Sequence, residues 1–191
     1  MTDRQQVDHE QIAKLEANLL TGGGEDLARY FQSINAPSPI TRWSPSIEDL
    51  DEEVLRILLA YWQRMPKGLH LPLADGLDPL ELGGALGLIM LLEVLDGGYD
   101  FRYRVYGSEI ARRSGFDATG KCVSEIPVAP MSAYFMAGYR ACLSRQEPLF
   151  TRHVPPVQIH VVSWDRIILP LEDGQGTVSR LLVGNVPGSW R

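Results

Sequence analysis

The feature that most constrains this chain is a β-hairpin pattern between residues 88 and 106. An apolar run, Leu88–Leu95, precedes the turn residues "DGG" and a stretch, Phe101–Tyr106, in which arginines alternate with aromatic and apolar residues. Two strand-like runs joined by a glycine-rich turn predict a hairpin. Strict alternation predicts two opposite faces on the second strand: Phe101, Tyr103 and Val105 on one, and Arg102, Arg104 and Tyr106 on the other.

Beyond the hairpin, the pattern predicts a short helix, a long helix and three strands. Ser108 is a suitable cap for the short helix, and Gly115 a suitable stop. Residues 130–147 are apolar nearly all round, which indicates a helix that packs on more than one side. The order of elements predicts an α+β fold, a five-stranded antiparallel sheet with helices on one face. The last three of its strands are expected at Leu149–Val154, Ile159–Leu171 and Thr177–Val186.

The first part of the chain reads as a helical extension. Two short amphipathic helices are predicted on either side of the glycine run in "TGGGED". A third amphipathic helix is expected over residues 47–64, with Ser46 as its cap. We therefore divide the chain into an N-terminal helical extension, residues 1–45, and a domain over 46–191 that begins with this third helix. The apolar stripes of the first two helices are Ile12, Leu15 and Leu19, and then Leu27, Tyr30, Phe31 and Ile34.

Charge and composition argue against two classes of partner. The formal net charge is −6, so the field of the whole molecule opposes a nucleic acid. Arg102 and Arg104 are then expected on a solvated or ion-paired strand face. No window has the length and apolar character of a membrane span, and "MTDRQQVDHEQ" lacks the apolar core of a secretory signal. With two cysteines and no CxxC spacing, we expect a cytoplasmic protein with reduced thiols.

Five short motifs in order carry a resemblance to a known family. They are "AYWQRMPKG" (60–68), "DPLEL" (78–82), "FRYRVYG" (101–107), "GFDATGK" (115–121) and "RIILPLEDG" (166–174). With these motifs, residues 46–187 resemble a PAS domain, and more narrowly the stand-alone PAS proteins of alphaproteobacteria, the fifth-numbered PAS family. The resemblance implies a bacterial protein of sensing or protein–protein signalling, and it implies no chemistry. It makes the helix at 47–64 the N-terminal cap and the helix at 130–147 the flank of a ligand pocket.

A pocket between that long helix and the sheet gives a set of candidate ligand-binding residues. Alternation puts one set of side chains of the penultimate strand on the pocket side, but it does not say which set. The alternative is that the same side chains fill a solid core. The candidates are Tyr134, Phe135, Gly138 and Cys142 from the helix, with Val162 and Trp164, or instead Ile167 and Leu169, from the strand.

No cofactor or metal ion is expected. No two of the four histidines have metal-site helical spacing, and Pro155 and Pro156 separate His153 from His160. The resemblance implies that a haem-binding relative would carry a histidine on the long helix, which this chain lacks. It also implies an asparagine–cysteine–arginine motif in flavin photosensors, and Cys122 in "GKCVSE" stands without that motif.

The chain shows no catalytic motif, so we expect a non-enzymatic module with no catalytic residues. Ser163 and Asp165 fall on one face of a regular strand, and His160 falls on the other. An enzyme that transforms a small molecule on the same scaffold is the alternative. The resemblance places Arg102, Arg104 and Arg166 at positions typical of the family, where the expected structural use is a salt bridge to an acidic group such as Glu81 or Asp165.

Signalling by this chain requires a partner. Its 191 residues hold no kinase, cyclase or DNA-binding domain, so the output is expected to pass to a separate signalling protein. A homodimer is also expected, with residues 10–65 as most of its interface, because three apolar stripes there have to be buried.

Overall fold

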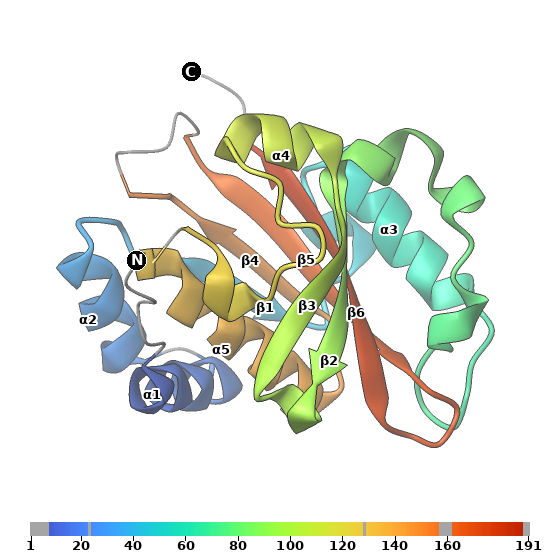
Figure 1. The fold of residues 1–191 in the computed structure, drawn as a ribbon, viewed down its shortest axis with the longest axis horizontal. Helices are drawn as coiled ribbons and strands as arrows, with labels where there is room; N and C mark the ends of the chain where they lie inside the picture. Colours follow the sequence, from blue (N-terminus) through green and yellow to red (C-terminus); the bar gives the residue numbers. More distant parts are fainter. Residues whose placement is uncertain (1–7, 23, 128, 157–161, 189–191) are drawn as a thin grey trace.

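The computed structural model describes residues 8–22, 24–127, 129–156 and 162–188. These residues form one antiparallel sheet with helices packed against it (Figure 1). Its strands are β1 (Ile40–Trp43), β2 (Ile89–Leu95), β3 (Asp100–Tyr106), β4 (Leu149–His153), β5 (Trp164–Glu172) and β6 (Val178–Pro187). Their spatial order is β1-β4-β5-β6-β2-β3, so the predicted hairpin of β2 and β3 lies at one edge of the sheet.

Five α-helices accompany the sheet in the described part of the chain. They are α1 (His9–Leu20), α2 (Glu25–Ser33), α3 (Glu53–Arg64), α4 (Ser108–Ser114) and α5 (Ala129–Arg145). Five 3-10 segments are η1 (Ile47–Asp49), η2 (Ala74–Gly76), η3 (Pro79–Leu88), η4 (Asp96–Gly98) and η5 (Val123–Glu125). None of the described helices is long and apolar enough to cross a membrane. The α+β class and the order of elements from residue 88 onwards are confirmed.

The sheet has six strands, so the prediction of five was wrong. The added strand, β1, pairs with β4 from Ile40 opposite Arg152 to Trp43 opposite Leu149. It is an edge strand of four residues that alternate between exposed and half-buried positions. Such a short segment after Pro37 and Pro39 carries no apolar run that a pattern search detects.

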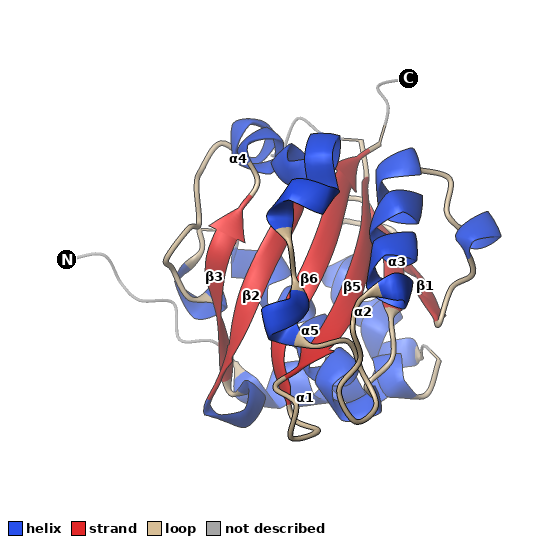
Figure 2. Cartoon of the chain, turned by 90° about the vertical axis from the view of Figure 1, so that its right-hand side faces the viewer, coloured by secondary structure: helices blue, strands red, loops and turns tan. Residues whose placement is uncertain are grey.

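Helices cover both faces of the sheet, so the prediction of helices on one face was also wrong (Figure 2). Every residue of β5 is buried, which requires packing on both sides of that strand. Ile167 and Leu169 belong to the core that α3 closes, whereas Trp164 and Ile168 belong to the core that α5 closes. On the α3 side the helix approaches β6 at Gly184, where an added Cβ would lie 2.5 Å from Leu58 Cδ1.

The two predicted N-terminal helices are confirmed, and they pack on the chain's own long helix. Asp8 caps α1, because its Oδ1 accepts from the backbone N–H groups of Glu10 and Gln11 at 3.0 and 3.1 Å. Glu16 of α1 accepts from Ser144 of α5 at 2.9 Å. The α1 and α2 stripes are buried within the chain: Ile12, Leu15 and Leu19 in α1, and Leu27 and Phe31 in α2. Burial of these stripes removes the reason for expecting them to form a dimer interface.

The third predicted helix is shorter than expected. Ser46 and Asp49 form a capping box on the 3-10 turn η1 rather than on an α-helix. The α-helix itself starts at Glu53, after an extended residue at Glu52. The apolar side of α3 is buried against the sheet and η3. On its other side Ile57 is 41% exposed.

Candidate functional site

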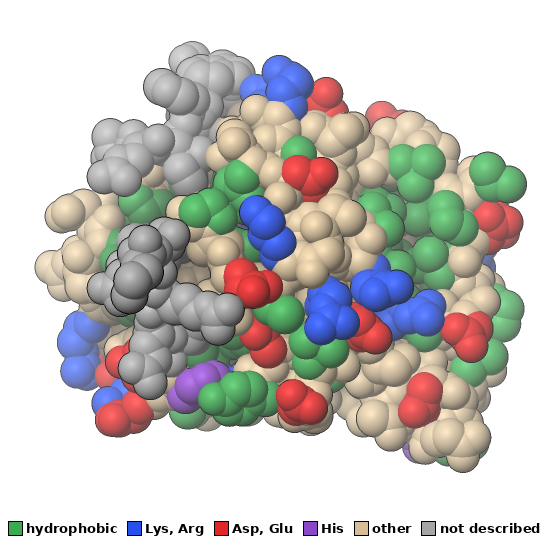
Figure 3. Space-filling view, viewed as in Figure 1, with side chains coloured by type: hydrophobic (Ala, Val, Ile, Leu, Met, Phe, Trp, Pro, Cys, Tyr) green, Lys and Arg blue, Asp and Glu red, His purple; other side chains and the backbone are tan. Residues whose placement is uncertain are grey.

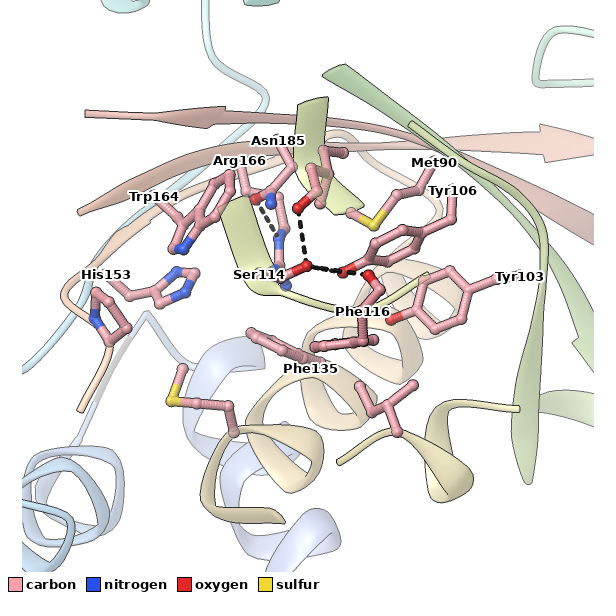
Figure 4. Close-up of a pocket in the computed structure, with 14 residues that line it drawn as sticks. Met90, Tyr103, Tyr106, Ser114, Phe116, Phe135, His153, Trp164, Arg166 and Asn185 are labelled. Atoms are coloured by element: carbon pink, nitrogen blue, oxygen red, sulfur yellow. Dashed lines mark hydrogen bonds between the residues drawn. The ribbon is translucent and has the colours of Figure 1, made fainter. Parts of the chain in front are cut away.

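A cavity lies between α5 and the sheet, and α4 and the segment that follows it form a further part of its wall (Figure 4). It offers about 40 Å³ to water-sized molecules. One water occupies about 10–15 Å³ of such space, so the cavity has room for about three. Its apolar walls are Met90, Ile110, Phe116, Ile126, Met131, Phe135, Pro155 and Trp164, and its polar walls are Tyr103, Tyr106, Ser114, His153, Arg166 and Asn185.

An irregularity in the hairpin brings Tyr106 into this cavity. Between β2 and β3, Leu91 pairs with Val105 but Leu92 pairs with Tyr103, which leaves Arg104 as an extra, bulged residue. The rings of Tyr103 and Tyr106 therefore lie on the same side, with centroids 5.2 Å apart. Val105 turns outward and is 40% exposed. The predicted alternation was wrong for the last two residues of the strand, because a bulge shifts the two-residue period by one.

Ser114 reaches the cavity wall because α4 ends beside the cavity. The helix stops at Gly115, whose φ of +81° is the left-handed conformation that glycine adopts without strain. Ser114 Oγ donates to the carbonyl oxygen of Ile110 at 2.8 Å and lies 3.3 Å from the Tyr106 hydroxyl. The predicted stop at Gly115 is confirmed, and it sets the position of this hydroxyl.

Arg166 is the charged group of the cavity. Its side chain leaves the middle of the sheet and points between Asn185 and the ring of Phe135 (Figure 4). Only 4% of the residue is exposed. Arg166 Nε donates to Asn185 Oδ1 at 3.3 Å, and the guanidinium carbon lies 4.1 Å from the centroid of the Phe135 ring. No carboxylate of the described residues forms an ion pair with it.

The acids proposed as partners of Arg166 are paired with other arginines. Glu81 accepts from Arg64 at 3.1 Å, at the surface. Asp165 accepts from Arg152 Nε at 2.7 Å. The predicted salt bridge of Arg166 was therefore wrong. Asp165 and Arg166 are adjacent in a strand, so their side chains point to opposite faces of the sheet.

His153 is a second buried polar group at the cavity. It is 2% exposed, and its Nδ1 has no hydrogen-bond partner among the described residues. The rings of Tyr134 and Phe135 each lie 5.6 Å from the imidazole ring. Burial, and then the positive charge of Arg166, lower the pKa of His153 well below its ordinary value. At neutral pH the ring is therefore uncharged.

The phenol groups around the cavity keep their protons. Burial raises the pKa of Tyr106 to about 12 and that of Tyr134 to about 12. Burial raises the pKa of Tyr103 well above its usual range. The described walls of the cavity thus hold one cation, Arg166, and no anion.

The structure brings two of the predicted ligand-binding residues, Phe135 and Trp164, to the cavity wall. Two others lie beside it on α5. The Tyr134 ring packs edge-on against Phe31, with centroids 4.9 Å apart, and Gly138 faces Ile168 of β5. Trp164, Arg166 and Ile168 are thus the side of β5 that faces α5.

The remaining four predicted residues lie away from the cavity. The Cys142 thiol is buried and donates to the carbonyl oxygen of Glu147 at 3.2 Å. Val162 is 45% exposed. Ile167 and Leu169 point to the α3 face, so this alternative set of the strand was wrong for a cavity under α5.

None of the six polar wall residues was among the predicted ligand-binding residues. They come from several elements, and a strand pattern ranks an apolar residue above a polar one as a core candidate. One signal was present for Arg166: it stands two residues after Trp164, so alternation puts both on the same face. The missed polar residues are Tyr103, Tyr106, Ser114, His153, Arg166 and Asn185.

The structure also places the residues weighed for metal, catalytic and nucleic-acid sites. Within the described ranges, no three His, Cys, Asp or Glu side chains are grouped as they would be around a metal ion. His160 and the predicted strand start at Ile159 lie outside the described residues. Arg102 and Arg104 lie 3.6 and 3.8 Å from the same carboxylate, Glu93. Basic and acidic side chains are interspersed on this face of the molecule (Figure 3).

Comparison with known proteins gives a distant structural match. One solved structure, described as an RNA-binding Light-Oxygen-Voltage receptor, matches with a TM-score of 0.39 and 14% sequence identity. The match covers 93% of this chain and 59% of that chain, so this chain spans less than two thirds of the receptor's length. No family model matches, and no curated protein matches. At this level of similarity the match assigns neither a family nor a function to this chain.

Proposed function

We propose that this protein is a non-enzymatic sensor module of the PAS type, which binds a small molecule between α5 and the sheet and acts through a separate protein partner. The observation that carries the proposal is the cavity, lined by a buried arginine, a buried histidine and a buried amide. It lies between the sheet and the long helix, where the sequence resemblance places a ligand pocket.

The polar groups around the cavity destabilise the fold while they lack partners. Burying a charge or an unpaired polar group is unfavourable by several kcal/mol unless partners compensate it. Apolar residues of similar volume would make a more stable core at Arg166 and His153. A chain that carries polar groups there gains stability when a bound molecule supplies the missing partners.

Binding is favoured over catalysis because the polar groups are not arranged to activate one another. Ser114 Oγ donates to a backbone carbonyl, and no hydrogen bond joins it to His153. Nucleophilic catalysis needs a base within hydrogen-bond reach of the nucleophile and a group that orients the base. His153 Nδ1 has no such orienting partner among the described residues. The enzyme alternative therefore has no specific observation in its favour.

A route from the cavity to the surface runs through α5. Phe135 forms part of the cavity wall, while Arg140, a little more than one turn later, lies 3.2 Å from the His9 ring of α1. A ligand that moves α5 would also move the helix pair of α1 and α2, which lies on the outer side of α5 (Figure 1). We propose that a signalling partner binds to this helix pair and responds to its movement.

Tryptophan side chains allow a direct test. The Trp164 indole lines the cavity, whereas the indoles of Trp43 and Trp62 donate to the backbone oxygens of Leu19 and Pro170 at 2.9 and 2.8 Å. Small molecules of two to five heavy atoms are added to ¹⁵N-labelled full-length protein. We expect one or more to shift the Trp164 indole signal and leave those of Trp43 and Trp62 in place. Trp190, outside the described residues, is assigned with a Trp190→Phe variant.

A cavity-filling variant provides the control. Ile126→Phe adds volume at the cavity wall, and Ile57→Phe makes the same change on the exposed side of α3. We expect the first variant to lose the Trp164 response and the second to keep it. A library that never moves Trp164, or moves it equally in both variants, contradicts the proposed binding site.

A further inference from the structure

Arg166 differs from the other buried charged residues of the described chain in how its charge is compensated. Asp165 is held by Arg152 at 2.7 Å. The Glu172 carboxylate accepts from the backbone N–H groups of His70 and Leu71 at 3.0 and 2.9 Å. Arg166 has one neutral amide oxygen, at 3.3 Å, and one aromatic face. The fold therefore leaves a permanent positive charge without its anion at the cavity wall.

The free part of the guanidinium is its terminal fork. Nε donates to Asn185 Oδ1, and the guanidinium carbon lies over the Phe135 ring, 4.1 Å from its centroid. None of the described residues accepts a hydrogen bond from Nη1 or Nη2. Two parallel N–H donors in one plane match the two oxygens of a carboxylate, which is the geometry that arginine recognises best. Asn185 adds its amide nitrogen as a neighbouring donor, because its oxygen is already used by Arg166.

The rest of the wall suits a small apolar body. Aromatic and aliphatic side chains make most of the lining, and the hydroxyl of Tyr106 keeps its proton because its pKa is raised to about 12. An apolar cavity of about 150 Å³ accommodates benzene. A cavity of about 40 Å³ therefore fits only a few heavy atoms beyond those of water.

We infer that the ligand of this cavity is a short-chain organic carboxylate, held by the guanidinium fork of Arg166 with Asn185, and with its hydrocarbon part against Phe135 and Trp164. This inference rests on the proposed function and adds the ligand class to it. It commits to the carboxylate and not to a tetrahedral inorganic anion, because the wall offers a planar fork and apolar surface instead of donors on all sides.

The experiment follows the Trp164 indole signal while formate, acetate or propionate is added to the full chain at constant ionic strength. The matched probes are propionamide, which keeps the shape without the charge, and sodium phosphate and chloride, which carry charge without the apolar body. We expect a saturable shift with a carboxylate, and a response at least about tenfold weaker with the amide and with the inorganic anions.

Three variants locate the interaction. Arg166→Met keeps most of the volume and removes the fork, so the affinity for the carboxylate should fall about tenfold or more. Arg166→Lys keeps the charge without the planar fork and should also bind more weakly than the unchanged protein. Arg104→Met removes an arginine that is exposed on β3, and it should leave binding unchanged. Should Arg166→Met not fold, Arg166→Lys and the amide probe still decide the question.

The outcomes separate this inference from the proposed function. If neutral molecules shift Trp164 as strongly as carboxylates, and equally in Arg166→Met, the carboxylate inference is wrong while the binding module stands. Phosphate or chloride binding as tightly as propionate also overturns it. If no compound moves Trp164 in the unchanged protein, both the inference and the proposed function fail.

Discussion

His153 is the residue whose burial has a direct consequence for pH. Its ring faces Arg166, Tyr134 and Phe135, and its pKa is lowered well below the ordinary value of 6.5 by burial and then by the charge of Arg166. In the unfolded chain His153 therefore binds a proton near pH 6.5, whereas in the folded chain it binds one only at lower pH. Stability from this group is complete above pH 6.5 and is lost as the pH falls below it, until the folded pKa is reached.

We predict that unfolding in urea at pH 7.5 and 5.5 reveals this proton. The free energy of unfolding should fall by about 1 kcal/mol more in the unchanged protein than in His153→Leu, which has no proton to bind. His70→Leu serves as the control for an exposed histidine. Equal pH dependence in the unchanged protein and in His153→Leu would show that the ring is protonated in the folded state as readily as in the unfolded one.

Among individual residues of the site, the sequence predicted apolar wall residues and missed the polar ones, because the partners of a polar side chain depend on the three-dimensional fold. Phe135 and Trp164 are recognisable because large apolar residues on a long helix and a central strand are core candidates. The partner of a polar residue depends on which face of a strand it occupies and on which acids reach it. Glu81 and Asp165 have the charge that would suit Arg166, but in the structure Glu81 pairs with Arg64 and Asp165 pairs with Arg152.

At the scale of elements, the bulge in the hairpin decides what the cavity contains. Arg104 is the extra residue of β3, between a pair formed by Val105 and a pair formed by Tyr103. Sequence alternation predicts Tyr106 outside because it assumes an unbroken period of two. A bulge adds one residue to the strand, and an alternation of arginines and aromatics does not reveal it. The strand was therefore assigned correctly, and only the side on which Tyr106 lies was predicted wrongly.

Deleting single residues of β3 tests this register. Without Arg104, the pairs of Val105 with Leu91 and Tyr103 with Leu92 become consecutive, so Tyr106 still faces inward. We predict a loss of stability of no more than about 1–2 kcal/mol. Deleting Arg102 instead turns Phe101, which is fully buried, toward solvent, and should cost more than about 3 kcal/mol. Urea unfolding of the two variants gives the comparison. An equal loss in both would contradict the register.

The helix α5 is a second element whose surroundings the sequence predicted only in part. Its sequence is apolar nearly all round, which predicted contacts on more than one side, and the helix lies between the sheet and the pair α1–α2. The pattern did not reveal what covers its second side. The N-terminal stripes were apolar enough to pack either on α5 or on a second copy of the chain. The sequence pattern is the same for both, so the packing on α5 is seen only in the three-dimensional structure.

At the scale of the whole molecule, the sequence predicted the order of elements and not the full set of layers. The hairpin, the long helix and the final strands are local patterns, and each is present in the described residues, with the penultimate strand starting at Trp164 instead of Ile159. The second covering layer depends on α3 reaching Gly184 of β6, a contact between residues far apart in the chain. The continuous apolar run "IILPL" in β5 was the available signal, because a strand buried on both faces shows no alternation.

The last prediction concerns the helix pair α1–α2 as a cover for the rest of the molecule. A chain that starts at Ser38 lacks both helices but keeps β1. It leaves bare the apolar side of α5, where Tyr134 packs against Phe31. We expect this shortened chain to have a lower melting temperature and to self-associate, because an apolar patch of that kind seeks another partner. Thermal unfolding and sedimentation of both chains at about 20–50 μM, the range in which an interface of standard size is populated, provide the measurement. A dimer of the full chain would have to use surface other than the buried stripes of α1 and α2. A shortened chain that is monomeric and equally stable would show that these helices cover nothing the fold needs.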